Sequence, residues 1–422
     1  GSNNHKLYYY DIGDYLSRSK KLNIIEDFNS VKGIEWQSIS PDQNYDWINQ
    51  RDPHYQAYSA ISGEELSPFY DNAPGINTSR DAWAISFSNQ KVGQNIKKLI
   101  LNYNNGLDKH IDDSLINDVN WSAGLRKLYK KGVILEYNPK KILLSMYRPF
   151  TKKWLYYDRY LTERPGKYAH QWGKHNEAIL TSGRGANVFA TLATDLIPNF
   201  NCLTATQGFM KLNNESSKTL FAKSNNVNEN FAHKLGLSLN QTFAYVYAVL
   251  NSKEYKKRYT NDLKKELARI PLLKDTVQYA TIGQKLIDLH LNYESVKPYQ
   301  DVNVVFKGEP SYRVHKMKFA KKRNPDTGKL ENDRSTIIFN DSITISNIPD
   351  KAYQYVVNGR SAIEWIMDQY RIKTDNKSGI TDDPNDYSDD PKYIFNLLLR
   401  IINVSVQTVD LINQLPKLNI VE

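Results

Sequence analysis

The spacing of hydrophobic and polar positions changes several times along the chain. Val92, Ile96 and Leu99 recur every three or four residues, which predicts an amphipathic helix over residues 90–103. Between residues 141 and 206 the pattern changes to short apolar runs separated by prolines and glycines, which is typical of strands and turns. The gaps between these runs are too short for crossover helices, so an antiparallel or mixed sheet is expected.

The same patterns predict elements elsewhere. The expected strands are 7–11, 141–147, 153–158, 178–181, 187–193 and 202–206, and the expected helices are 14–27, 90–103, 243–250, 255–267, 276–293, 361–370 and 390–415.

A second sheet is predicted between residues 302 and 346. Two apolar and basic runs, 316–320 and 336–340, flank Asn324-Pro325-Asp326-Thr327-Gly328, whose residues suit a tight reversal of the chain. This arrangement predicts a β-hairpin with a basic first strand. A helix should follow it, because Ser361 and Glu364 have the spacing of a capping box.

These elements predict an α+β fold. Two β-containing lobes with mixed or antiparallel sheets are joined by a helical segment, and helices end the chain. The expected parts are an acidic N-terminal region (1–120), a first β-rich lobe (121–237), a helical spacer (238–300) and a second lobe with the hairpin and the C-terminal helices (301–422).

Composition narrows the class of protein. Of the 422 residues, 40% are hydrophobic and 12% aromatic, which excludes a wholly disordered chain. No apolar run approaches eighteen residues, so no membrane span is predicted. The single cysteine, Cys202, excludes an intramolecular disulfide framework and a cysteine-cluster zinc site, and a buried core position is expected for it. We therefore expect a cytoplasmic protein.

The net charge of +10 is concentrated in the middle of the chain. Residues 121–340 carry 37 lysines and arginines against 18 acidic residues, a net charge of +19. The flanks, 1–120 and 341–422, carry net charges of −5 and −4. A basic middle between acidic flanks indicates a polyanion such as DNA as the partner, although ordinary solvated helix faces would give the same count.

The first basic cluster follows the predicted strand at 141–147. Arginine can bond guanine edges or phosphates, and asparagine or glutamine can bond adenine, so the polar residues here are candidate DNA contacts. Its aromatic neighbours Trp154, Tyr156 and Tyr157 are expected in the core. Arg184 lies in a lone Gly-x-Gly that is expected to be a turn between strands. The candidates are Arg148, Lys152, Lys153, Arg159, Arg164, Lys167, His170, Gln171, Arg184 and Asn187.

The second basic cluster lies on the predicted hairpin. Lys316 and Lys318 alternate with Met317 and Phe319, which places both charges on one face of the strand. A basic hairpin can enter a DNA groove, whereas an edge strand protected by lysines would have the same sequence. The candidates are Arg313, Lys316, Lys318, Lys321, Lys322 and Arg323.

Catalytic motifs are missing from the sequence. It contains no phosphate-binding P-loop, no Gly-x-Ser-x-Gly elbow and no His-Glu-x-x-His metal motif. The acidic stretch 382–390 lacks the glycine and glutamate of a calcium loop, and we expect a solvated loop that ends in a helix cap. No catalytic or metal-binding residue is therefore predicted.

Four groups of residues resemble one family, the C-terminal specificity region of Type ISP restriction–modification enzymes. The order of the groups along the chain is the one expected for that family. They are Tyr10-Asp11-Ile12-Gly13-Asp14-Tyr15-Leu16; Tyr147-Arg148-Pro149-Phe150 with Trp154-Leu155-Tyr156-Tyr157-Asp158 and Glu163-Arg164-Pro165-Gly166; Tyr255-Lys256-Lys257-Arg258-Tyr259 with Ala268-Arg269-Ile270-Pro271-Leu272, also similar to single-chain Type II methyltransferase–nucleases; and Val356-Val357-Asn358-Gly359-Arg360-Ser361 with Asp383-Pro384-Asn385.

The resemblance implies a target recognition domain for double-stranded DNA, cut from a longer polypeptide. In that family other domains carry an adenine-N6 methyltransferase, an ATP-driven translocase and a nuclease, with S-adenosylmethionine, ATP and Mg as cofactors. The methyltransferase tetrapeptide Asn-Pro-Pro-Tyr is absent, and residues 137–140 do not replace it. We therefore expect a recognition domain that is not itself an enzyme. The alternatives are a self-sufficient methyltransferase or nuclease, and a protein–protein scaffold.

Overall fold

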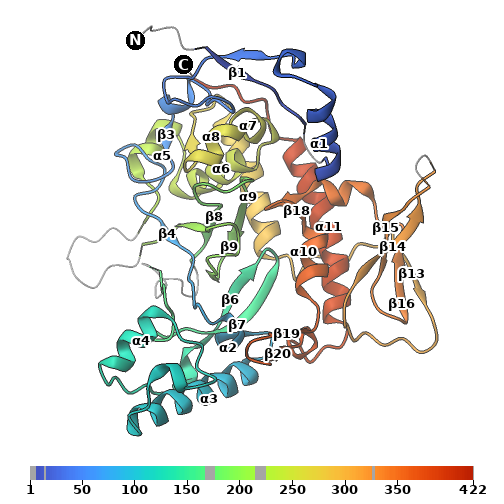
Figure 1. Ribbon diagram of the computed structural model, residues 1–422. Coiled ribbons are helices and arrows are strands. Elements are labelled where there is room, and N and C mark those ends of the chain that lie inside the picture. Colours follow the sequence, from blue (N-terminus) through green and yellow to red (C-terminus); the bar gives the residue numbers. More distant parts are fainter. Residues whose placement is uncertain (1–5, 14–15, 167–175, 214–224, 326–327, 422) are drawn as a thin grey trace. The chain divides into compact units, whose positions relative to one another are not determined.

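The computed structural model describes residues 6–13, 16–166, 176–213, 225–325 and 328–421. The chain forms two compact units, residues 1–55 and 56–422 (Figure 1). In the first unit, β1 (Leu7–Tyr9) pairs antiparallel with β2 (Gln37–Ile39), which confirms the first predicted strand. The helix α1 (Arg18–Asp27) begins later than predicted, because the Ser17 hydroxyl accepts the Lys20 N–H and caps it.

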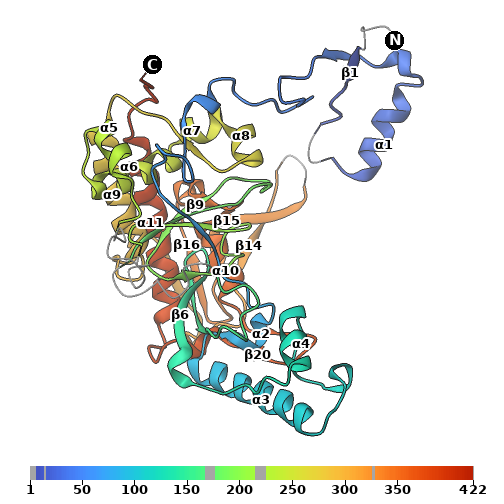
Figure 2. The ribbon, with the colours of Figure 1, turned by 90° about the vertical axis from the view of Figure 1, so that its left-hand side faces the viewer.

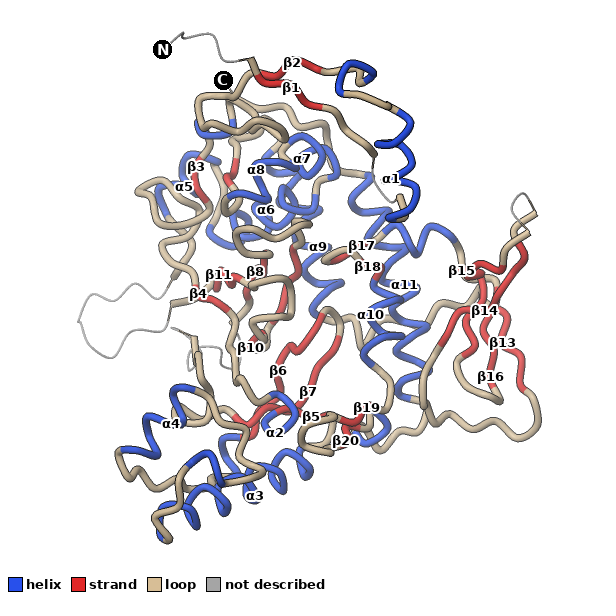
Figure 3. The backbone as a smooth tube through the Cα atoms, viewed as in Figure 1, coloured by secondary structure: helices blue, strands red, loops and turns tan. Residues whose placement is uncertain are grey.

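The second unit contains three four-stranded sheets, and Figure 3 shows how short their strands are. The first sheet has the order β10–β6–β7–β5, the second β4–β11–β8–β9 and the third β13–β16–β15–β14. Their bounds are β4 (Ala73–Pro74), β5 (Ile85–Ser86), β6 (Ile142–Arg148), β7 (Thr151–Tyr156), β8 (Ala178–Thr181), β9 (Thr191–Thr194), β10 (Ile197–Pro198), β11 (Gln207–Met210), β13 (Asn303–Phe306), β14 (Lys318–Arg323), β15 (Leu330–Ile338) and β16 (Ile343–Ser346).

Three two-stranded ladders and ten helices complete the described part of this unit. The ladders pair β3 (Ser59–Ala60) with β12 (Arg269–Ile270), β17 (Val356–Val357) with β18 (Arg360–Ser361), and β19 (Lys373–Thr374) with β20 (Thr381–Asp382). The helices are α2 (Asp81–Ala84), α3 (Asn89–Asp108), α4 (Ala123–Lys130), α5 (Glu229–Leu235), α6 (Leu239–Asn251), α7 (Lys253–Arg258), α8 (Thr260–Lys265), α9 (Thr276–Leu291), α10 (Ala362–Gln369) and α11 (Tyr393–Asn413).

The α+β class is confirmed. Within the three large sheets, β10 and β6 pair in parallel and the other pairs are antiparallel, as expected for a mixed sheet. The predicted hairpin forms from β14 and β15, and the capping box at Ser361 and Glu364 has both of its hydrogen bonds. Cys202 is fully buried, as expected. The four predicted parts, with boundaries after residues 120, 237 and 300, stay predictions.

Two sequence predictions of elements are wrong. Residues 202–206 form a turn instead of a strand, since the Cys202 N–H bonds the Asn199 carbonyl and Ala205 has a left-handed φ of 51°. The strand β11 begins directly afterwards. The single basic helix predicted at 255–267 is divided into α7 and α8 at Tyr259, whose side chain is buried. Burying this tyrosine outweighs the local preference for one continuous helix.

Two hydrophobic clusters stand out among the described residues of the second unit. In one, the apolar face of α3 packs on β5 and β7, with Tyr103, Trp121 and Tyr129 in edge and tilted ring contacts. The other and larger core includes residues of β8, α10, α11 and the β13–β16 sheet. Figure 2 shows α3 and α4 at one end of this unit, away from α6 and α9.

The helix α11 is part of the larger core. Among the described residues, α11 has the length and composition to cross a membrane, and 56% of that stretch is buried within the protein. Phe395 makes ring contacts with Phe339 and Tyr312. The hydrophobicity of α11 therefore serves packing in the larger core, where the helix contacts α9 and α10.

A buried histidine predicts an acid-sensitive core. His290 on α9 bonds Tyr247 through Nδ1 (2.6 Å) and Thr408 through Nε2 (2.9 Å), and burial lowers its pKa from 6.5 to about 3. The unfolded chain would bind a proton below pH 6.5 that the folded chain excludes. The free energy of unfolding should therefore fall by about 1.4 kcal/mol per pH unit from this residue alone as pH drops from 6 to 4.

Urea unfolding at several pH values measures this slope. In His290→Gln the slope should be shallower by that amount; an identical slope would contradict the assignment.

Candidate nucleic-acid interface

An open groove of about 620 Å³ runs along the first strand of the hairpin, β14. Met317, Phe319, Ile338 and Met367 give it an apolar floor. Its basic residues are Lys316, Lys318, Lys321 and Arg371. Lys316 and Lys318 are exposed, whereas Met317 is buried and Phe319 half-buried, so charged and apolar side chains alternate where the chain enters β14. A groove with basic edges suits a polyanion.

A smaller cavity of about 200 Å³ lies between the β6–β7 hairpin and the segment that follows α10. Acids outnumber bases in its lining, whereas in the groove the four cations outnumber two acids, Glu364 and Asp368. The charged and polar side chains that line the smaller cavity are Asp81, Tyr147, Lys153, Asp368, Gln369, Arg371, Lys373, Asp375 and Asp382.

The groove and the smaller cavity meet at one acid–base pair. Asp368 and Arg371 line both, and Arg371 lies 3.5 Å from the Asp368 carboxylate. Asp368 also pairs with Arg360 at 3.0 Å. The backbone here is anchored to the approach to β14, since the Ile372 N–H bonds the His315 carbonyl. The two cavities form one continuous candidate surface, which we call the groove–cavity surface.

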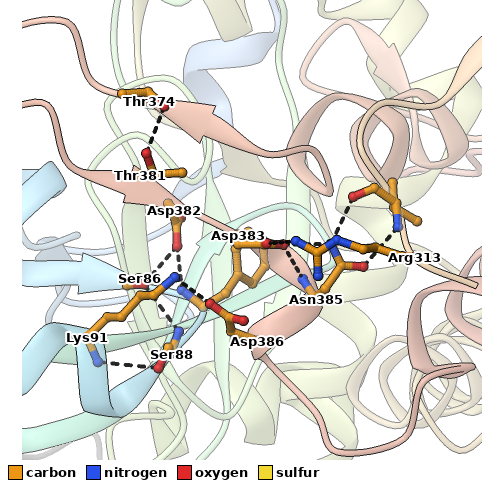
Figure 4. A network of polar contacts seen from close by, with 12 residues as sticks. Ser86, Ser88, Lys91, Arg313, Thr374, Thr381, Asp382, Asp383, Asn385 and Asp386 are labelled. Atoms are coloured by element: carbon orange, nitrogen blue, oxygen red, sulfur yellow. Dashed lines mark hydrogen bonds and ion pairs between the residues drawn. The ribbon is translucent and has the colours of Figure 1, made fainter.

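Asp382 holds the wall of the smaller cavity together (Figure 4). Its carboxylate accepts hydrogen bonds from the Ser86 hydroxyl (2.7 Å), the Phe87 N–H (2.9 Å) and the Lys153 ammonium (2.7 Å). The Lys153 ammonium also lies 4.2 Å from the Phe87 ring centre. Burial lowers the pKa of Lys153, and the Asp382 charge opposes this shift.

The neighbouring acidic residues make further links between distant segments. Asp383 pairs with Arg313, and Asp386 pairs with Lys91 of α3 at 2.5 Å. Burial acts to raise the pKa of Asp383, but hydrogen bonds from Asn385 and the Arg313 charge bring it below the ordinary value. The prediction of a solvated loop at 382–390 is therefore wrong for its first half. These carboxylates connect the first sheet and α3 to the approach to β14. The helix cap expected at the end of this stretch is also wrong, because α11 begins at Tyr393 and its N-cap residue, Lys392, makes no capping hydrogen bond with its side chain.

The comparisons with known proteins identify the family. The family model for the Type ISP C-terminal specificity domain matches residues 67–397. This chain belongs to that family. A comparison with curated protein sequences found no match.

Solved structures agree with this family. A nuclease-deletion mutant of the Type ISP restriction–modification enzyme LlaGI, in complex with a DNA substrate mimic, is 43% identical with a TM-score of 0.86, and the match covers 100% of this chain and 34% of that one. The ATP-dependent Type ISP enzyme LlaBIII bound to DNA is 38% identical with a TM-score of 0.84, covering 99% of this chain and 28% of that one. The DrdV–DNA complex, at 22% identity and a TM-score of 0.82, shares the fold. This specificity domain therefore spans about a third of the Type ISP chains that it matches.

Three predicted contacts of the first basic cluster have partners inside the specificity domain. Lys153 is buried against Asp382, and Lys152 pairs with Glu294 at 2.6 Å. The Arg148 guanidinium stacks 4.0 Å from the Tyr147 ring centre and donates to Asn199. Each of these cations contributes to packing.

The other described residues of this cluster are exposed. Arg159, Arg164, Arg184 and Asn187 lie on the surface, outside the groove–cavity surface. The turn predicted at Arg184 is present, with a left-handed Gly185 after it. Lys167, His170 and Gln171 lie outside the described residues. Of the aromatic neighbours, Tyr156 is buried as predicted, while Trp154 and Tyr157 are half-buried.

The second cluster divides into free and engaged cations. Lys316 and Lys318 are exposed, line the groove and have no ion pair or hydrogen bond from their side chains among the described residues. Lys321 donates to Asn332 at 2.6 Å, Lys322 lies 3.7 Å from Asp333 and Arg323 donates to the Gly328 carbonyl at 2.8 Å. Arg313 is half-exposed but pairs with Asp383. The hairpin therefore presents Lys316 and Lys318 most freely.

Sequence analysis missed the cations after α10. Arg371 and Lys373 line the smaller cavity, yet they lie in the C-terminal flank whose net charge is −4. Averaging charge over a long segment concealed them, because neighbouring aspartates cancel them in the count. A local signal was available: Arg371 and Lys373 directly follow the predicted capping-box helix.

Proposed function

We propose that this chain is the module that recognises a specific sequence in double-stranded DNA for a Type ISP restriction–modification enzyme. The observation that carries the proposal is the groove–cavity surface, where two lysines without partners among the described residues flank an apolar floor. The Type ISP neighbours LlaGI and LlaBIII are described with a DNA substrate mimic and with DNA. Basic side chains position a protein on phosphates, and base edges supply sequence specificity.

The proposed phosphate contacts are the exposed cations. Lys316 and Lys318 form the centre of this set, with Lys321, Lys322 and Arg323 further along the hairpin. Arg159, Arg164, Arg184 and Asn187 are proposed contacts at other exposed positions, and Lys167, His170 and Gln171 keep the role predicted from sequence. Arg148, Lys152, Lys153 and Arg313 are left out, since each is engaged by a residue from a distant part of the chain, whereas the partners of Lys321, Lys322 and Arg323 lie on the hairpin itself.

The salt dependence of DNA binding tests the proposal. If six to ten phosphates are contacted, affinity should drop by about a thousandfold or more between 50 and 200 mM salt. Fluorescence anisotropy with labelled duplexes measures this drop. A flat salt dependence would contradict the charge argument. A protein–protein scaffold would bind neither target nor random duplexes specifically.

We further propose that methyl transfer, translocation and cleavage belong to other parts of the parent polypeptide. The matched Type ISP chains are about three times longer than this one. S-adenosylmethionine, ATP and Mg would be bound there, because the phosphate loop and the methyltransferase tetrapeptide are missing from this sequence. Incubating the chain with DNA, labelled S-adenosylmethionine and Mg²⁺ should leave the DNA unmodified. Methyl transfer or cleavage would instead favour a self-sufficient enzyme.

We propose that the N-terminal unit contacts those other parts, and that the enzyme works in the cytoplasm with the DNA. The helix α1 has no buried residue, and Leu22 and Ile25 on it are more than half exposed. Trp36 and Trp47 are also exposed, so this unit presents much uncovered apolar surface. Deuterium exchange of α1 should be slower in the parent enzyme than in this chain; equal exchange would contradict the contact.

A further inference from the structure

Arg371 occupies the junction of the groove–cavity surface with part of its guanidinium unused. Its side chain is 35% exposed, and its ion pair with Asp368 is long, at 3.5 Å. Among the described residues, the guanidinium makes no other hydrogen bond, ion pair or ring contact. Since a guanidinium has five N–H donors in a planar fork, one edge is available to a ligand.

The backbone beneath Arg371 is rigid. Tyr370 is fully buried and packs on Phe87 with ring centres 5.1 Å apart. The Arg371 N–H bonds the Gln369 carbonyl, and the next N–H bonds the His315 carbonyl, each at 3.0 Å. A side chain that reads a base must start from such a fixed point, because small errors in position weaken paired hydrogen bonds.

Asp368 restricts the side chain as well. One carboxylate oxygen, Oδ2, forms an ion pair with Arg360 (3.0 Å) and accepts a hydrogen bond from the Gln369 amide (2.9 Å). The other, Oδ1, faces Arg371. The contacts of Oδ2 therefore fix the Asp368 carboxylate, and its other oxygen, Oδ1, can orient the Arg371 guanidinium.

The surroundings favour a base edge over a phosphate as the ligand. On the groove side lie Lys316 and Lys318, which suit the DNA backbone. On the cavity side four carboxylates (Asp81, Asp368, Asp375 and Asp382) face three cations (Lys153, Arg371 and Lys373), so the cavity has no excess positive charge to hold a phosphate. A base edge carries no net charge and offers both donors and acceptors. Guanine presents O6 and N7 as paired acceptors that match an arginine fork, and the paired cytosine presents an amino donor suited to a carboxylate.

We propose that Arg371 reads a guanine of the DNA target and that Asp368 is its positioning residue. This inference rests on the proposed function and deepens it, because it assigns a base contact to a residue outside the basic middle of the chain. The groove lysines would bind the phosphates of the DNA backbone, while Arg371 would hydrogen-bond the guanine edge at the mouth of the smaller cavity.

Selection of bound duplexes from a random-sequence pool tests the proposal with the full 422-residue chain. The wild-type chain should select a motif that includes a guanine. In Arg371→Ala the preference for a G·C pair at that position should fall by about tenfold or more. The preferences at the other positions of the motif should be unchanged. Arg371→Lys should also lose preference, because an ammonium cannot form the fork. Asp368→Asn should weaken the same position only.

Arg126→Ala is the matched control. It removes an arginine of similar exposure, 42%, that also pairs with an aspartate, Asp113, but lines neither the groove nor the cavity. The motif should survive this change. The proposal is overturned if Arg371→Ala keeps every position of the motif, or if it lowers affinity for all sequences equally and reduces the salt slope by about one, as a phosphate contact would. A wild-type chain that selects no motif would instead contradict the proposed function. Unchanged urea unfolding of each variant excludes misfolding.

Discussion

Replacing Lys316 and Lys318 together by glutamate should weaken duplex binding by about a hundredfold near 100 mM salt. Both side chains are exposed along the groove and have no ion pair or hydrogen bond among the described residues, so they are free to contact phosphates. Losing two phosphate contacts should reduce the salt slope by about two, and each glutamate adds repulsion at close range. Fluorescence anisotropy over a series of salt concentrations measures both quantities.

The control for this variant is Lys234→Glu with Lys285→Glu. Both are exposed helical lysines outside the groove and the smaller cavity, and the change in net charge is the same. A loss of only a few fold is expected from the altered net charge. If the control loses as much affinity as the groove variant, binding depends on total charge and the groove is not the contact surface.

Replacing Asp382 by asparagine should lower the free energy of unfolding by about 3–5 kcal/mol, because it leaves the buried Lys153 ammonium without its counter-charge. Lys153 is 8% exposed and lies 2.7 Å from Asp382, which also accepts two hydrogen bonds from the region of β5. Urea unfolding followed by tryptophan fluorescence measures the change. Lys153→Met combined with Asp382→Asn should recover part of the loss, since no unpaired charge then remains in the interior.

An exposed ion pair provides the comparison. Lys98 and Asp118 lie 2.8 Å apart with side chains 58% and 41% exposed. Water screens such a pair, so Lys98→Met should change the free energy of unfolding by less than about 1 kcal/mol. A loss below 1 kcal/mol for Asp382→Asn as well would show that Asp382 is not required to hold the cavity wall.

The cavity wall bears on the proposed base contact because it lies next to the segment that carries Arg371. Asp382 belongs to β20, whose partner strand β19 follows Arg371 by two residues. Loosening the contact between Asp382 and the first sheet would therefore disturb the junction of the groove and the cavity. We expect destabilised variants at Asp382 to lose sequence preference before they lose non-specific affinity, which depends on the hairpin lysines.

Local sequence signals determined many elements of this fold. The β14–β15 hairpin follows from two alternating runs around a turn-forming pentapeptide, and the start of α10 follows from a capping box. Helix α3 follows from apolar residues at helical spacing. Each of these signals acts over a few residues, so the local sequence is sufficient to predict the element. The exposure of the two groove lysines could be predicted for the same reason, because charged and apolar residues alternate there and both charges fall on one face.

What the sequence alone determined about this protein is therefore its α+β class, its family and a β-hairpin with a basic first strand. Only the tertiary structure decided which cations are free. Lys153 and Arg148 share the sequence features of a DNA contact, yet Asp382 and Asn199 engage them from distant parts of the chain. Arg371 lies in an acidic flank, yet packing brings it to the edge of β14. The physical reason is that a charge is neutralised by whatever lies within a few ångströms in space, and the spacing of residues along the chain does not specify those neighbours.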